Sequence, residues 1–274
     1  MIIVVLLLLG LCLGSFTNAL VWRLHEQTGS KSKKASKDLS ITQGRSMCPD
    51  CHHQLGFWDL IPVFSWLGLK GKCRYCHKPI SPQYPLVELL TAALFIFSYA
   101  VWPYGWADIG IFQFAVWLGV STGFMALTIY DARWQILPSR VLYPVGVLAA
   151  LQVVVLTFAQ RDWQVAFGAL LGVICLGGLF YALFQVSGGR WIGGGDVRLG
   201  VVIGLLVGGP AEAILVLFIA SLLGTMFALP SLITKKPELT RRVAFGPFLV
   251  VATVIVYLFG ASLINWYKTH FLLL

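Results

Sequence analysis

The sequence predicts an all-α integral membrane protein with about eight transmembrane helices and a cytoplasmic loop that holds four cysteines. Hydrophobic residues make up 58% of its 274 residues and charged residues only 11%, whereas soluble domains carry about 25% charged residues. The apolar residues gather in stretches close to the length of about 20 residues that spans a bilayer as a helix. This composition excludes a soluble domain, a disordered chain and a nucleic-acid-binding module, although the net charge is +9.

Eight apolar segments are expected to cross the membrane. In chain order they are residues 2–22, 86–102, 109–130, 137–158, 163–186, 197–210, 211–233 and 246–266. The second and sixth are short. The tract 197–233 is apolar throughout, and we divide it at Gly208-Gly209-Pro210 because glycine and proline interrupt helices. The first segment has no basic residue before it, as a cleaved signal peptide would have, so we expect an uncleaved anchor.

The placement of Lys and Arg predicts the orientation of these segments. With the N-terminus outside and eight crossings, 18 of the 20 basic residues face the cytoplasm, ten of them in residues 23–85. Cytoplasmic loops are enriched in basic residues, so this orientation is favoured over its reverse. The basic flanks 31–37 and 235–242 are then placed to meet anionic lipid.

The loop 23–85 contains two C-x₂-C pairs, formed by Cys48, Cys51, Cys73 and Cys76. Two such pairs close a tetrahedral zinc site, and a reducing cytoplasmic loop argues against disulfides. Reduced structural thiols or a redox pair remain the alternative, and three nearby histidines could replace a ligand: His52, His53 and His77. We expect a structural zinc site, with residues 1–22 as an anchor helix, 23–85 as the zinc-binding loop and 86–274 as the remaining membrane domain.

Two aspartates fall at the cytoplasmic ends of predicted spans. Asp131 ends the third span, and Asp196 follows the glycine run Gly193–Gly195 and opens the sixth. Ionisable groups beside a membrane span are costly and are functional candidates. Two neighbouring carboxyl groups share a proton, so that one activates water while the other protonates a carbonyl oxygen. The alternative is an interfacial carboxylate paired with Arg133 or Arg198.

Several motifs in order resemble the type IV prepilin peptidases, bifunctional membrane aspartic proteases. Besides the cysteine loop they are Gly14-Ser15-Phe16-Thr17-Asn18, Leu60 to Trp66, Ile80 to Glu88, Asp131 to Pro138, Gly193-Gly194-Gly195-Asp196 and Phe245-Gly246-Pro247-Phe248. The resemblance implies Asp131 and Asp196 as catalytic residues, with Gly193 and Gly195 in the active-site loop. Three positions depart from the family pattern: His25, Ser139 and Arg198. None is a proposed catalytic aspartate.

The resemblance also implies the reaction and its setting. Members cleave the leader of prepilins or pseudopilins at the cytoplasmic face of the bacterial inner membrane. They then methylate the new N-terminal amine with S-adenosylmethionine, although no Gly-rich cofactor motif is present here. Two other classes remain open, a proton-coupled transporter and a non-catalytic scaffold with a zinc module. The sequence leaves open which prepilin is the substrate and what the oligomeric state is.

Overall fold

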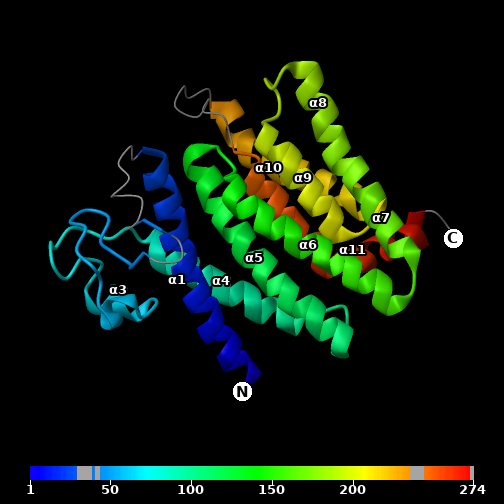
Figure 1. The fold of residues 1–274 in the computed structure, drawn as a ribbon. Coiled ribbons are helices and arrows are strands. Elements are labelled where there is room, and N and C mark those ends of the chain that lie inside the picture. Colours follow the sequence, from blue (N-terminus) through cyan, green and yellow to red (C-terminus); the bar gives the residue numbers. More distant parts are fainter. Residues whose placement is uncertain (30–38, 41–43, 235–243, 272–274) are drawn as a thin grey trace. The chain divides into compact units, whose positions relative to one another are not determined.

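The structure, a computed structural model, describes residues 1–29, 39–40, 44–234 and 244–271, and it consists of helices joined by turns and loops (Figure 1). These residues form no strand, only the isolated bridges Met47–Gln54 and Lys72–Pro79. The predicted all-α fold class is therefore confirmed. The basic flanks 31–37 and 235–242 lie outside the described residues. The chain divides into two compact units, Met1–Val101 and Trp102–Leu274.

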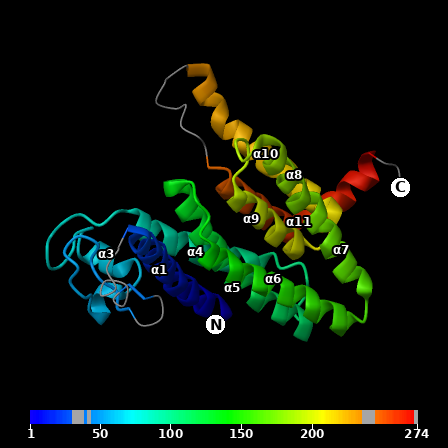
Figure 2. The ribbon, with the colours of Figure 1, turned by 45° about the horizontal axis from the view of Figure 1, so that its top comes forward.

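The first unit is a helix pair with the cysteine loop between its members. Helix α1 (Ile2–Gly29) packs along α4 (Gln83–Ala100), and the short helices η1 (Phe57–Leu60) and α3 (Phe64–Gly68) lie in the loop (Figures 1 and 2). Gly14 permits the close approach of α1 and α4, because a Cβ atom at this position would lie 2.6 Å from the Cα atom of Glu88. Small residues at such contacts are typical of helix pairs in membranes.

The second unit is a bundle of helices. It contains α5 (Asp108–Trp134), α6 (Ser139–Gln160), α7 (Trp163–Val173), the π-helical turn η2 (Ile174–Gly178), α8 (Leu179–Ser187), α9 (Gly194–Val207), α10 (Pro210–Thr234) and α11 (Gly246–Phe271). Helix α9 is the central element, since it contacts α6, α7, η2, α8, α10 and α11. Figures 1 and 2 show it among α6, α8, α10 and α11.

Close glycine contacts hold α9 in this central position. A Cβ atom on Gly204 would lie 2.6 Å from the carbonyl carbon and oxygen of Gly172 in α7. Helix α9 ends at Val207, and Gly208 follows with the positive φ of 76° that glycine adopts without strain. Pro210 then begins α10. The predicted division of the tract 197–233 at Gly208-Gly209-Pro210 is therefore confirmed.

Each predicted span coincides with helix. Seven helices of the described chain are long and apolar enough to cross a membrane, with α7, η2 and α8 together forming one of them. The sixth predicted span is α9, and its 14 residues rise about 21 Å at 1.5 Å per residue, less than the roughly 30 Å of a bilayer core. The predicted orientation therefore requires α9 to cross the membrane despite its length.

Candidate active site and metal centre

Asp131 lies near the C-terminal end of α5 and is only 6% exposed. Its Oδ2 accepts a hydrogen bond of 3.0 Å from the backbone N–H of Gly246, the first residue of α11. Because residue 246 is a glycine, the α11 backbone comes close to the carboxyl group: a Cβ atom here would lie 2.6 Å from Oδ2. The N-terminus of α11 thus holds the Asp131 carboxyl group in place.

Asp196 is placed in the same way by the first turn of α9. Its Oδ2 accepts a hydrogen bond of 3.3 Å from the backbone N–H of Gly193, which caps this helix. Gly195 faces the loop between α5 and α6, where an added Cβ atom would lie 3.0 Å from the Cβ atom of Leu137. The glycine run therefore lets the start of α9 lie against the segment that follows Asp131.

The structure brings the two aspartates together, since their carboxyl groups are close enough to interact electrostatically. Neither takes part in an ion pair with another described residue; the ion pairs found there are Arg74–Asp59 and Lys78–Asp50. Arg198 donates instead to the hydroxyl of Ser139 at 2.7 Å. This arrangement argues against the simple alternative in which Arg198 neutralises a structural carboxylate.

The role of Gly246 was not predicted from the sequence. The motif Phe245-Gly246-Pro247-Phe248 was noted there without a contact assigned to it. The available signal was the Gly-Pro pair at the start of an apolar segment, since proline is favoured in the first turn of a helix, where backbone N–H groups have no acceptor within the helix and can bind an anion.

The four cysteines of the first unit come together as predicted. Their sulfur atoms all lie within 4.8 Å of one another, and none forms a disulfide. The two pairs have matching turns. In the first, the N–H of His52 donates to the carbonyl of Cys48, and in the second the N–H of His77 donates to that of Cys73, each at 3.0 Å. The cluster can hold a metal ion with its four thiol groups.

The chemistry of the cluster suits a cation. Burial opposes ionisation of the Cys73 thiol, but the backbone N–H groups of Cys76 and Tyr75 and the neighbouring thiols together lower its pKa to about 7. A thiolate, the form that binds metal, is therefore accessible near neutral pH. The turns are also joined by an ion pair of 3.0 Å between Lys78 Nζ and Asp50 Oδ1. The remaining cysteines, Cys12 and Cys175, lie in helices away from the cluster.

The fold and the two sites define a multi-pass membrane protein with an interacting carboxyl pair and a separate four-cysteine centre. Residues 8–102 match the bacterial peptidase A24 N-terminal domain. Residues 118–229 match the type IV leader peptidase family. The chain belongs to this family.

Relatives match nearly the whole chain. The prepilin leader peptidase/N-methyltransferase of Aeromonas hydrophila is 31% identical over 97% of this chain and 93% of its own length. The protein of the same name from Pseudomonas aeruginosa is 31% identical over 95% of this chain and 91% of its own. The type 4 prepilin-like proteins leader peptide-processing enzyme of Escherichia coli is 36% identical over 88% of this chain and 87% of its own. No solved structure matches the chain.

Proposed function

We propose that this chain is a membrane aspartic peptidase in which Asp131 and Asp196 cleave the leader of a prepilin or pseudopilin. One carboxylate takes a proton from a water molecule, and the other, in its protonated form, donates a proton to the carbonyl oxygen of the peptide bond. No covalent intermediate is needed. The observation that carries this proposal is that two carboxyl groups from helices distant in sequence lie within electrostatic range of each other, each held by a backbone N–H group at a helix N-terminus.

The backbone hydrogen bonds prepare both groups for this reaction. In each aspartate the bond occupies Oδ2, and within the described part of the chain Oδ1 accepts no hydrogen bond, so it is available to water or substrate. Both donors are at helix N-termini, where the helix dipole favours a negative charge. The glycines at 193 and 195 form the active-site loop in this proposal, because residues without side chains let an extended peptide come close.

Replacement of each aspartate by asparagine tests this assignment. Asp131→Asn and Asp196→Asn keep the size of the side chain but remove its acid–base chemistry, so we expect each to lower cleavage by at least about 1,000-fold. The measurement is the mass of a prepilin-like peptide after incubation with purified enzyme. Asp162→Asn, at the exposed N-cap of α7, is the matched control. Near-normal cleavage by either of the first two variants would remove that residue from the mechanism.

Family membership favours this peptidase over the two other classes, the proton-coupled transporter and the non-catalytic scaffold. The chain combines peptidase and N-methyltransferase activities, as the names of its relatives indicate. We infer that S-adenosylmethionine is the methyl donor. Within the chain, residues 1–22 anchor the protein, 23–85 form the zinc-binding loop and 86–274 contain the peptidase site.

We propose that the metal in the cysteine cluster is a structural zinc ion. Four thiolates complete a tetrahedral shell and leave no open position for catalysis. The double variant Cys48→Ser/Cys51→Ser should lose the metal, whereas the control Cys12→Ser/Cys175→Ser should retain about one zinc per chain. Metal analysis of protein purified under reducing conditions gives the answer. Wild-type protein without zinc, or a zinc content unchanged in the first variant, would refute the assignment.

We also propose that the N-terminus lies outside the cell and that the carboxyl pair faces the cytoplasm in the bacterial inner membrane. The distribution of basic residues supports this orientation. A single cysteine at Ser139, close in sequence to Asp131, should resist an impermeant thiol reagent added to intact cells. A cysteine at the exposed Arg161 should react with it. The reverse labelling pattern would contradict the orientation.

A further inference from the structure

The cysteine loop exposes several large apolar side chains. They lie in the loop tip, residues 57–68, which contains the two short helices η1 and α3 in contact with each other. Phe57 is 77% exposed, Trp58 72%, Phe64 69% and Leu67 58%. The Phe57 and Trp58 rings pack edge to face, with their centroids 5.7 Å apart. Exposed apolar side chains that gather in this way mark a site of interaction.

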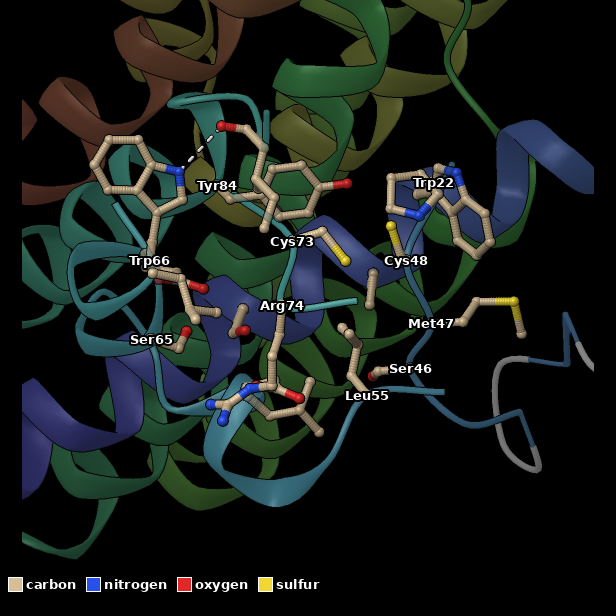
Figure 3. A pocket seen from close by; sticks show the side chains of 18 of the residues that line it. Trp22, Ser46, Met47, Cys48, Leu55, Ser65, Trp66, Cys73, Arg74 and Tyr84 are labelled. Atoms are coloured by element: carbon tan, nitrogen blue, oxygen red, sulfur yellow. Dashed lines mark hydrogen bonds and ion pairs between the residues drawn. The ribbon is translucent and has the colours of Figure 1, made fainter. Parts of the chain in front are cut away.

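The loop tip has an inner and an outer side. On the inner side, Ser65 and Trp66 of α3 line a pocket whose other walls include α1 (Figure 3). The Nε1 of Trp66 donates to the carbonyl of Ile80 at 3.1 Å, the dashed bond in Figure 3, and this bond holds α3 in place. Phe64 and Leu67 are three residues apart, so they share one face of α3. Helix α3 is therefore amphipathic, and its outer face is available to a partner.

A hydrogen bond to α4 places the loop tip at the depth of a membrane span. The N–H of Val63, between η1 and α3, donates to Oε2 of Glu88 at 2.7 Å. Glu88 lies five residues after Gln83, the first residue of α4, or about 7.5 Å along the helix. Helical side chains lean toward the N-terminus, so Val63 lies beside the first two turns of α4. These turns belong to the span, because the 18 residues of α4 rise only about 27 Å and a bilayer core measures about 30 Å.

The helix pair also exposes apolar side chains at this level. On α4 they are Leu86, Leu89 and Leu90, all within two residues of Glu88. On α1, Phe16 is exposed next to Ser15, whose side chain hydrogen-bonds to Glu88. Both helices are long and apolar enough to cross a membrane. The loop tip therefore lies at a level where lipid surrounds α1 and α4.

The charges around the loop tip suit an anionic membrane surface. Lys70 and Lys72 follow the tip directly and are exposed, and within the described ranges of the chain neither takes part in an ion pair. The only acidic residue of the tip, Asp59, has a side chain that is 6% exposed and is paired with Arg74 at 2.7 Å. Aromatic rings beside unpaired basic residues are typical of segments that lie at the interface of a bilayer containing anionic lipid.

We propose that the loop tip inserts into the interface of the membrane that α1 and α4 span. Its outer apolar side chains contact lipid, as the apolar faces of amphipathic helices do at a depth of about 5–10 Å in the boundary between headgroups and acyl chains. Lys70 and Lys72 lie among the headgroups. This docking requires neither the peptidase activity nor a particular orientation of the chain.

The cysteine turns stand farther from the bilayer core than the loop tip. His52, in the first cysteine turn, lies near Trp22 of α1, with the ring centroids 6.5 Å apart. Trp22 is seven residues beyond Ser15 along α1, a rise of about 10.5 Å. The loop is therefore graded in depth, with its metal-binding end in water and its aromatic tip in the interface.

Spin labels on the outer side of the loop tip test this docking. p-Acetylphenylalanine is incorporated in place of Phe57 or of Phe64 in the full-length protein and coupled to a nitroxide, so every cysteine stays in place. The protein is reconstituted into vesicles of phosphatidylcholine and phosphatidylglycerol. Collisions of the label with oxygen, which concentrates among acyl chains, are compared with collisions with a water-soluble nickel chelate. We expect oxygen collisions to dominate at both positions.

Two further positions calibrate the measurement. A label at Gln54, exposed in the first cysteine turn, should collide mainly with the nickel chelate, and a label at Leu90, exposed on α4, mainly with oxygen. Dominant collisions with the chelate at either Phe57 or Phe64 would place the loop tip in water and overturn the proposal. Low accessibility to both reagents would mean that protein covers the tip, either a second copy or a substrate chain, and would overturn it as well.

Discussion

Replacement of Gly246 by alanine tests how closely the start of α11 controls the Asp131 carboxyl group. The new methyl group would lie 2.6 Å from Oδ2 and 3.2 Å from Cγ of Asp131, whereas ordinary contacts begin at 3.4 Å. The two groups must therefore separate by about 0.8 Å (from 2.6 to 3.4 Å). The distance between Gly246 N and Oδ2 is now 3.0 Å. With this shift it would exceed the usual hydrogen-bond range of about 2.7–3.2 Å.

The expected magnitude follows from the lost bond. A hydrogen bond to a charged group contributes about 1.5–3 kcal/mol, and a displacement near 1 Å in an active site costs about 100-fold in rate. We therefore expect kcat/KM for leader cleavage to fall by about 10- to 100-fold. The assay follows cleavage of a prepilin-like peptide by mass spectrometry.

Gly224→Ala in α10 is the matched control, because its added Cβ atom would meet nothing closer than 3.7 Å. It should cleave at the wild-type rate. Wild-type kinetics in Gly246→Ala would refute the inference that this backbone contact positions Asp131.

Two further substitutions probe the position of α9. Gly195→Ala should lower kcat/KM by about three- to tenfold, because it pushes the start of the helix away from Leu137. Gly194→Ala, whose nearest contact would be at 3.8 Å, should change cleavage little. Equal reductions in kcat/KM for the two variants would contradict this reasoning. Gly204→Ala should destabilise the protein by about 1–3 kcal/mol through overpacking against α7, seen as a lower thermal midpoint in detergent. Gly178→Ala, with its nearest contact also at 3.8 Å, is the control and should unfold near the wild-type temperature. An equal decrease of the thermal midpoint in this control would count against the α7–α9 contact.

Local sequence patterns predicted the elements that depend on local chemistry. Apolar segments of spanning length predicted the helices, Gly208-Gly209-Pro210 predicted the break between α9 and α10, and the paired cysteines predicted the four-cysteine cluster. Each of these depends on residue types at short spacing, such as helix-breaking residues or thiols two residues apart. The convergence of Asp131 and Asp196 at one end of their spans was also expected from their positions relative to the apolar segments.

Such local patterns do not predict contacts between segments that are distant in the sequence. The N–H of Gly246 reaches Asp131 across 115 residues of sequence, and only the packing of α5 against α11 brings them together. Hydropathy also failed to distinguish α9, a short helix enclosed by others, from a segment that faces lipid, because both are apolar on all sides. The surroundings of Glu88 were also beyond local patterns, because its carboxyl group accepts from the backbone N–H of Val63, 25 residues earlier in the sequence.

The central claim is that Asp131 and Asp196 act as one catalytic unit, and a double-mutant cycle on leader cleavage measures this directly. Single-turnover rates are compared for wild-type protein, Asp131→Asn, Asp196→Asn and the double variant. Groups that share one reaction are strongly non-additive, so the double variant should be no more than about tenfold slower than the slower single variant. A shared carboxyl pair would be contradicted if the rate reductions of the two single variants multiplied in the double variant. Substantial cleavage by the double variant would contradict it as well.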